Sequence, residues 1–161
     1  MLPLARAIVS ELPEIILRAK REDVTESINR LSTNVRGGTE NIDEEDVFSA
    51  IDGSRIHDLV NLATSDSAAP VKQRQIAVAM VKAGRAGEAY KIATCIHNKN
   101  EIKNIAFALL ETTHPNLGEE AEEWIFLKKI FEYLGKPQRR NVRERMITLG
   151  LYPFGPWVEE I

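Results

Sequence analysis

The sequence predicts an all-α protein in which αα-hairpin repeats stack into a solenoid, a right-handed superhelix of about four helix pairs. Apolar residues recur with a helical period through most of the chain. The apolar run IAVAMV at 76–81 returns 29 residues later as IAFALL at 105–110, with alanine at the same two places. Such self-similarity is typical of stacked supersecondary units, because one unit cannot bury its apolar face alone.

Further copies extend this repeat toward the N-terminus. The run 47–51 lies 29 residues before 76–80, and the run 58–64 aligns with 88–94 at an offset of 30. A third copy of the second helix, 27–33, lies 31 residues before 58–64. We therefore expect each repeat to hold two helices that follow one another at a nearly constant spacing.

The two helices of a repeat differ in their apolar pattern. The run 76–83 is apolar nearly all round, which predicts a helix packed on both sides. The second helix carries one apolar stripe at i, i+3, i+4 and i+7, which predicts one solvated face. Its stripe consists of Ala89, Ile92, Ala93 and Ile96. Ala77 and Ala79 allow close helix contact, and Gly84 supplies the left-handed residue that ends the first helix.

This central stretch resembles the tetratricopeptide and HEAT-like superfamily of αα helical repeats. The resemblance rests on the alanines of the first helix, on Ala83-Gly84-Arg85 and Glu88-Ala89, and then on Ile92-Ala93. It covers residues 43–134 and identifies no subfamily. What it implies is a scaffold that binds proteins or peptides on a concave face.

Length and composition predict one domain. The chain has 161 residues, 43% of them hydrophobic, which is enough for a single core. We assign irregular N-terminal helices to 1–33, a mobile loop to 34–42, repeats to 43–134, and a C-terminal helix with a capping tail to 135–161. The apolar run near the N-terminus is interrupted by Arg6 and does not fit a signal sequence, and no segment is long and apolar enough for a membrane helix.

Turn and capping residues place the helix boundaries between 43 and 70. Asp43 is expected to cap a helix whose first turn holds three further acids, a position that the helix dipole favours. Consecutive acids point in different directions around a helix, so they do not form a calcium or magnesium site. Ser54 is expected to cap the next helix, and Pro70 is expected at the start of the helix after that.

No arrangement of residues predicts catalysis, a cofactor or a metal. His57, His97 and His114 lie on different predicted elements, and none is paired at i, i+4. Cys95 is the only cysteine; we interpret it as a small buried hydrophobe in a reducing, cytoplasmic compartment. There is no glycine-rich nucleotide-binding loop. We therefore expect a protein that is not an enzyme.

The C-terminal third is predicted to contain two more helices. Residues 118–134 form the longest predicted helix, and Ile125 and Ile130 widen its apolar stripe. The stripe itself consists of Trp124, Leu127, Phe131 and Leu134. A final helix after Pro137 is expected to carry three apolar residues into the core. These are Val142, Met146 and Leu149.

Two C-terminal features are candidate binding residues. The basic helix 136–145 places Arg139, Arg140 and Arg143 in one sector, where they fit phosphates or an acidic protein, or simply form a solvated face. The tail that follows is rich in proline and aromatic residues, with Tyr152, Phe154 and Trp157 as its anchors. It either folds back as a cap over the last helix or docks into a partner's groove.

The leading hypothesis is a non-enzymatic adaptor that binds another protein or a peptide on its helical-repeat surface. The alternative is a nucleic-acid-binding repeat that uses helix 136–145, which the net charge of −3 and the pI near 5.7 disfavour. A third is a secreted effector or a regulatory fragment of a larger solenoid. Exposed repeat ends also offer a contact for a second copy, giving a homo-oligomer.

Overall fold

The computed structural model describes residues 24–113 and 122–151, and all regular secondary structure in these ranges is helical. The all-α prediction is thereby confirmed. A helical segment at 24–34 precedes the seven labelled helices. They are α2 (Glu44–Asp52), α3 (Ile56–Ala63), α4 (Pro70–Lys82), α5 (Ala86–Ala93), α6 (Lys99–Thr112), α7 (Glu122–Phe131) and α8 (Lys136–Thr148).

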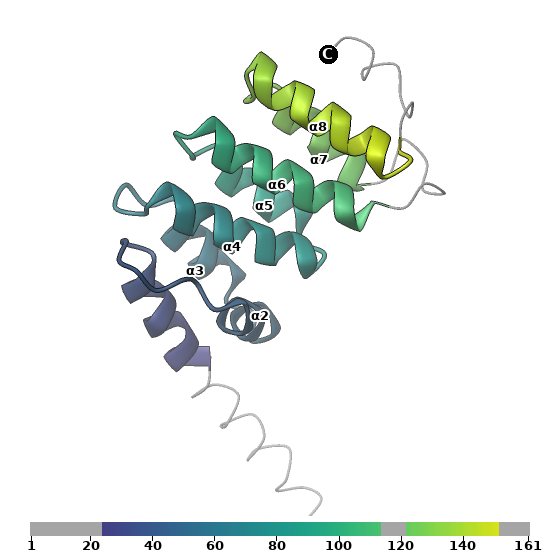
Figure 1. Ribbon diagram of the computed structural model, residues 1–161. Coiled ribbons are helices and arrows are strands. Elements are labelled where there is room, and N and C mark those ends of the chain that lie inside the picture. Colours follow the sequence, from purple (N-terminus) through teal and green to yellow (C-terminus); the bar gives the residue numbers. More distant parts are fainter. Residues whose placement is uncertain (1–23, 114–121, 152–161) are drawn as a thin grey trace, which may run out of the picture.

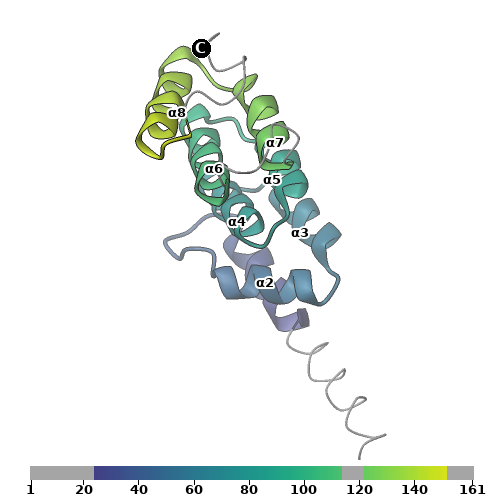
Figure 2. The same ribbon diagram turned by 90° about the vertical axis from the view of Figure 1, so that its right-hand side faces the viewer.

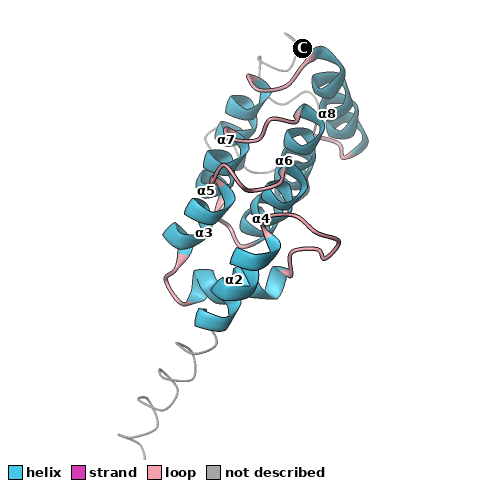
Figure 3. Cartoon of the chain, turned by 90° about the vertical axis from the view of Figure 1, so that its left-hand side faces the viewer, coloured by secondary structure: helices cyan, strands magenta, loops and turns pink. Residues whose placement is uncertain are grey.

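The helices from α3 onward form two layers. Helices α4, α6 and α8 lie side by side in one layer, and α3, α5 and α7 form the other (Figures 1 and 2). Within a layer α4 packs on α6, α6 on α8, and α5 on both α3 and α7, while α4 with α5 and α6 with α7 join the layers. Figure 3 shows the same layers from the side opposite to that of Figure 2, with loops at the helix ends.

Helix α4 lies at the centre of this arrangement, as its apolar pattern predicts. It contacts α2 and α6 on its two sides and α3 and α5 in the other layer. Ile76, Ala77, Ala79 and Met80 are all 0% exposed. Alanine is required where two neighbouring backbones approach closely, because a longer side chain would overfill a close-packed interior.

Buried residues of the central helices recur at the spacing predicted for them. Val47, Ile76 and Ile105, each 29 residues from the next, are all fully buried in α2, α4 and α6. In the other layer the fully buried pairs Leu59 with Ala63 and Ala89 with Ala93 recur at an offset of 30. The buried set of α5 returns again in α7, now 38 residues later.

The predicted register of the N-terminal copy is wrong by one residue. The buried residues Val24, Ser27 and Leu31 share the 3–4 spacing of Ile56, Leu59 and Ala63, which is an offset of 32 and not 31. The 31-residue alignment matched Thr33 with Thr64. Each of these hydroxyls donates to a carbonyl of its own helix, so their match reflects a local hydrogen bond and not a shared buried position. Burial, not this local hydroxyl pattern, sets the register.

An ion pair ties the 24–34 helix to α2. Asp46 is 5% exposed, and Arg30 donates from Nε and Nη2 to its carboxylate over 2.5–3.1 Å. This hydrogen bond and the carboxylate charge raise the pKa of Arg30 above its ordinary value. The helix dipole is therefore not the only reason for acidic residues in the first turn of α2, because one of them, Asp46, pairs with the neighbouring 24–34 helix.

Two of the three predicted boundary residues behave as expected. The Asp43 side chain accepts from the backbone N–H of Glu45 at 3.0 Å, and Pro70 opens α4. Ser54 does not cap α3; it adopts a left-handed conformation with φ of 61° in the turn after α2. A Cβ on Gly53 would lie 2.3 Å from a Val24 methyl carbon, so glycine at 53 allows the 24–34 helix to pack against this turn.

The segment 34–42, predicted to be mobile, is anchored to α4 and to its preceding loop. The N–H of Ala69 donates to the Val35 carbonyl at 3.0 Å, and the N–H of Ile42 donates to Gln75 Oε1 at 2.9 Å. Val35 and Ile42 are buried, whereas Gly37 and Gly38 between them have positive φ. The mobility of the intervening residues stays a prediction.

The C-terminal helices need two corrections. The apolar stripe predicted for α7 is buried. The helix ends at Phe131, three residues before the predicted end at Leu134. A turn follows it, in which the Leu134 N–H donates to the Phe131 carbonyl at 3.2 Å. Ile125 is 43% exposed and does not widen the stripe. Leu149 is 40% exposed, and Leu151 is buried where Leu149 was expected. The predicted helix start and the tail fall at 114–121 and 152–161, outside the described residues.

Replacing Ala79 with arginine should lower the free energy of unfolding by at least about 3 kcal/mol, because overpacking adds to the cost of an unpaired buried charge. Ala83→Arg is the matched control, since Ala83 lies one helical turn later in an exposed position. Thermal melts followed by circular dichroism compare the two variants. Equal melting temperatures would contradict close packing around α4.

Candidate functional site

Arg139, one of the predicted binding residues, makes a contact within the fold. It is half-buried, and its Nε donates to the Phe131 carbonyl at 2.8 Å. That carbonyl ends α7, where the last carbonyls of a helix lack intrahelical donors. Arg139 also occupies the position of the buried Ile102 in α6, since Val142 and Met146 correspond to Ile105 and Leu109 at the same offset of 37. Arg139 therefore joins α8 to α7.

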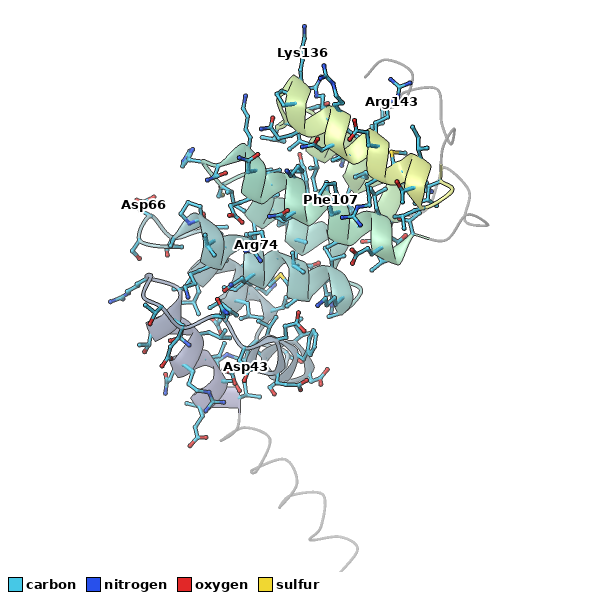
Figure 4. All side chains as sticks on the ribbon, in the orientation of Figure 1. Asp43, Asp66, Arg74, Phe107, Lys136 and Arg143 are labelled. Atoms are coloured by element: carbon cyan, nitrogen blue, oxygen red, sulfur yellow. The ribbon has the colours of Figure 1, made fainter. Side chains whose placement is uncertain are left out.

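The other predicted residues are placed less uniformly. Arg140 is exposed and Arg143 is half-buried. Figure 4 shows Arg143 and Lys136 projecting from α8 at the end of the helix stack. Tyr152, Phe154 and Trp157 lie outside the described residues. The structure thus brings two of the three arginines to the surface of α8.

An aromatic patch, defined as Tyr90, Phe126, Lys129 and Tyr133, lies on the layer formed by α5 and α7. The rings of Tyr90 and Phe126 are 5.6 Å apart, and Tyr133 meets Tyr90 edge-on at 6.2 Å. Lys129 Nζ lies 5.7 Å from the Tyr90 ring and 5.2 Å from the Phe126 ring. Aromatic pairs and cation–π contacts of this geometry each stabilise such an arrangement by about 0.5–1 kcal/mol.

The patch is partly open to solvent. Tyr133 is 38% exposed, and Tyr90 and Phe126 are half-buried. A Cβ on Gly87 would lie 3.3 Å from the Phe126 ring, so this glycine lets the ring approach α5 closely. The result is a partly exposed cluster of aromatic rings, and aromatic residues are enriched at protein interfaces.

The two phenols of the patch interact with each other. Hydrogen bonding with Tyr133, followed by partial burial, raises the pKa of Tyr90 above its ordinary value of 10.0. The titration of Tyr90 therefore depends on Tyr133.

The patch was not predicted from sequence, although a signal for it is present. Phe126 and Lys129 on α7 and Tyr133 in the turn after it fall at i, i+3 and i+7, the spacing of a second stripe beside the buried stripe of α7. Periodicity shows that α7 has two such stripes but does not show which helix neighbours the second. The contact with Tyr90 depends on the packing of α7 against α5.

A cationic surface lies on the other layer, around Phe107 on α6. Lys103 Nζ lies 5.7 Å and the Arg145 guanidinium 5.0 Å from its ring. Figure 4 shows Phe107 and Arg74 on the face formed by α4, α6 and α8. Within the described chain, Lys103, Arg140 and Arg145 form no ion pair, whereas Arg74 pairs with Glu101 at 2.7 Å.

A cavity of about 620 Å³ opens between the 64–70 loop and the end of α5, and Cys95 and His97 line it. Cys95 is half-buried and lies 3.9 Å from the Thr94 hydroxyl, so it is not the fully buried hydrophobe that we predicted. Across residues 24–113 and 122–151, no group of three or more His, Cys, Asp or Glu side chains is placed to hold a metal ion.

Comparison of the chain with models of protein families, with curated proteins and with solved structures finds no match in any of the three. The resemblance to tetratricopeptide and HEAT-like repeats therefore stays a prediction. Among the described helices, none combines the length and the apolar character needed to cross a membrane.

The Tyr133→Phe variant should lower the pKa of Tyr90 toward 10.0, because it removes the main cause of the raised value. The folded chain holds this proton more tightly than the unfolded chain, so the free energy of unfolding should fall as the pH rises from about 10. Alkaline titration of phenol absorbance measures the change, with Tyr90→Phe identifying the Tyr90 transition. An unchanged Tyr90 titration in Tyr133→Phe would contradict the interaction.

Proposed function

We propose that this chain is a non-enzymatic adaptor that binds another protein through the aromatic patch on α5 and α7. The observation that carries the proposal is a cluster of three aromatic rings, fixed by mutual contacts and by Lys129, that remains partly exposed. Rigid aromatic side chains lose little conformational entropy on binding and contribute much of the energy of protein interfaces.

The proposed scaffold is a right-handed solenoid of αα repeats. Supporting it are the two helix layers, the packing of each first helix on the next, and buried positions that recur at offsets of 29 and 30. A stack of this kind buries one continuous core and leaves the outward side chains of successive helices free to vary. Such a surface binds a partner without catalysing a reaction.

The single half-buried cysteine fits a reducing compartment such as the cytoplasm.

Removing the exposed part of the patch should abolish partner binding without unfolding the chain. We expect Tyr133→Ala and Lys129→Glu each to reduce capture of the bound protein from a lysate at least tenfold, because tyrosine is one of the residues that carry most interface energy and a glutamate at 129 would replace the cation that contacts both rings. Quantitative mass spectrometry of material retained by the full chain provides the measurement. Thermal melts check that the fold is retained.

Two control variants match these changes. Lys128→Glu makes the same substitution at the neighbouring exposed position of α7, and Ile147→Ala removes a 53% exposed apolar side chain from α8. Both should retain the partner. Loss of capture in the controls but not in the patch variants would place the binding surface elsewhere and reject the proposal.

A second candidate function is nucleic-acid binding on the face of α4, α6 and α8. The observation that favours it is the Phe107 ring flanked by cations, together with Arg140, which has no ion pair among the described residues. Aromatic rings beside positive charge are a common platform for single strands. The net charge of −3 opposes this function, because the acidic side chains repel phosphate.

We expect no specific binding of duplex DNA, structured RNA or single-stranded RNA at about 150 mM salt, since phosphate contacts weaken steeply as salt rises. Fluorescence anisotropy across a salt series tests this with the wild type and an Arg140→Glu, Arg145→Glu double variant. Arg139 is left intact because it bonds to α7. Tight binding at physiological salt that the double variant removes would favour the nucleic-acid function over the adaptor.

A further inference from the structure

We propose that the outward face of the layer formed by α4, α6 and α8 binds an acidic peptide in an extended conformation. The side-chain amides of Asn104 and Asn141 bind the peptide backbone. Lys103 and Arg140 pair with the carboxylates of the peptide. This face belongs to the layer opposite the aromatic patch, so the inference goes beyond the proposed function and does not depend on it.

Two polar positions of this face recur on all three helices. The buried residues Ile76, Ile105 and Val142 set an offset of 29 between α4 and α6 and of 37 between α6 and α8. At these offsets each helix carries a basic residue followed directly by an amide residue, and all six are at least partly exposed. The basic residues are Arg74, Lys103 and Arg140, and the amide residues are Gln75, Asn104 and Asn141. Figure 4 shows Arg74 on this face.

The first amide of the set, Gln75, binds a non-helical stretch of this chain. Its Oε1 accepts from the Ile42 N–H at 2.9 Å, and its Nε2 donates to the Asn41 side chain at 2.9 Å. Residues 40–43 contain no helix or turn. A side-chain amide supplies both an acceptor and donors, so it can serve the N–H and C=O groups of an extended peptide. Helix α4 thus provides an internal example of peptide binding at this position.

The next two amides, Asn104 and Asn141, have no such internal partner. Neither side chain forms a hydrogen bond with any described residue. Across the described part of the chain no buried side-chain N or O atom lacks a partner, so both amides are open to solvent. A peptide backbone offers them donors and acceptors, whereas the sugar–phosphate backbone of DNA offers only acceptors.

The cations of the face indicate a carboxylate ligand. Arg74 on α4 pairs with Glu101 of the neighbouring helix α6 at 2.7 Å. The residue of α8 that lies 37 positions after Glu101 is Gln138, which carries no charge, so α8 does not supply the equivalent partner for Lys103. Neither Lys103 nor Arg140 forms an ion pair with any described residue. Both are therefore available to the carboxylates of a partner.

Acidic side chains restrict the peptide to one part of this face. Glu144 is exposed one turn after Arg140 on α8, and Glu111 is exposed at the C-terminal end of α6. Both repel a carboxylate, and the net charge of −3 adds a general repulsion that salt screens. The peptide therefore crosses the N-terminal halves of the two helices, where Lys103 and Arg140 lie.

The spacing of packed helices suits a peptide in the polyproline II form. The axes of neighbouring helices lie about 8–10 Å apart. A polyproline II chain has about three residues per turn and rises about 3.1 Å per residue, so every third residue faces the same side at intervals of about 9 Å. A peptide with an acidic residue at every third position therefore presents one carboxylate to each helix.

The test uses a fluorescein-labelled peptide of four Glu-Pro-Ala units. Its control has glutamine in place of every glutamate. Fluorescence anisotropy with the full-length protein at about 100 mM salt should give saturable binding of the glutamate peptide with a Kd of about 100 µM or tighter. The glutamine peptide should bind at least about tenfold more weakly, because it cannot form charge-assisted hydrogen bonds with the two cations.

Two double variants separate the two kinds of contact. Lys103→Gln with Arg140→Gln should weaken binding of the glutamate peptide at least about tenfold. Asn104→Ala with Asn141→Ala keeps both cations and should weaken it at least about fivefold, because the backbone hydrogen bonds are lost. Lys128→Gln removes an exposed cation from the other layer and should bind like wild type. Thermal melts check that every variant is folded.

Three outcomes overturn the inference. The first is that the wild type shows no saturable binding of the glutamate peptide or binds the glutamine peptide equally well. The second is that the Asn104→Ala, Asn141→Ala variant binds like wild type, since charge alone then explains the interaction. The third is that a single-stranded RNA oligonucleotide, measured in parallel at about 150 mM salt, binds more tightly than the peptide and requires the same two cations.

The aromatic patch is tested separately. Tyr133→Ala, which removes part of that patch, should leave binding of the glutamate peptide unchanged, because the two surfaces lie on different helix layers. Loss of peptide binding in Tyr133→Ala would place the peptide on the patch and reject this inference. Failure of the peptide to bind wild type leaves the adaptor function of the patch intact.

Discussion

The packing of small residues in α4 against both of its neighbours is the constraint on which the rest of the structure depends. Ala77 and Ala79 are completely buried, so the backbones of α2 and α6 approach α4 closely on either side. Close approach fixes the register of each helix, because a shift of one residue would replace an alanine with a larger side chain at the contact. The same requirement explains why the buried positions of one helix return in the next helix of its layer, although the offset between them changes from 29 or 30 residues in the centre to 37 or 38 at the C-terminal end.

Because the exposed positions are not constrained by close packing, they can carry side chains that bind a partner. The outward position occupied by Val60 in α3 holds Tyr90 in α5 and Lys128 in α7, although the buried positions beside it repeat apolar residues. A phenol at this position of α5 faces α7, where it meets Phe126 and Tyr133. The patch is thus a local departure on a repeating core, and Gly87 adapts the backbone to it.

The charged residues show a similar division between fold and surface. Arg139 resembles its neighbour Arg140 in sequence, yet it donates to the last carbonyl of α7 while Arg140 extends into solvent. Asp46 resembles the other acids at the start of α2, yet it is buried against Arg30. Charge runs in this chain therefore combine structural and free side chains. Only the free ones, such as Lys91 beside the patch, are available to a partner.

The sequence by itself determined the helices, their spacing from residue 47 onward and the buried stripes, because these depend on periodicity and on local capping by residues such as Asp43 and Pro70. Only the tertiary structure decided the register of the 24–34 helix, the role of Ser54 and the contacts of Arg139. It also decided the aromatic patch. Each of these depends on contacts between residues that are distant in sequence or lie on separate elements: Val24 against Gly53, Phe131 beside Arg139, Tyr90 against Tyr133. Periodicity assigns a residue to one side of its own helix, but the neighbour on that side follows from how the helices pack.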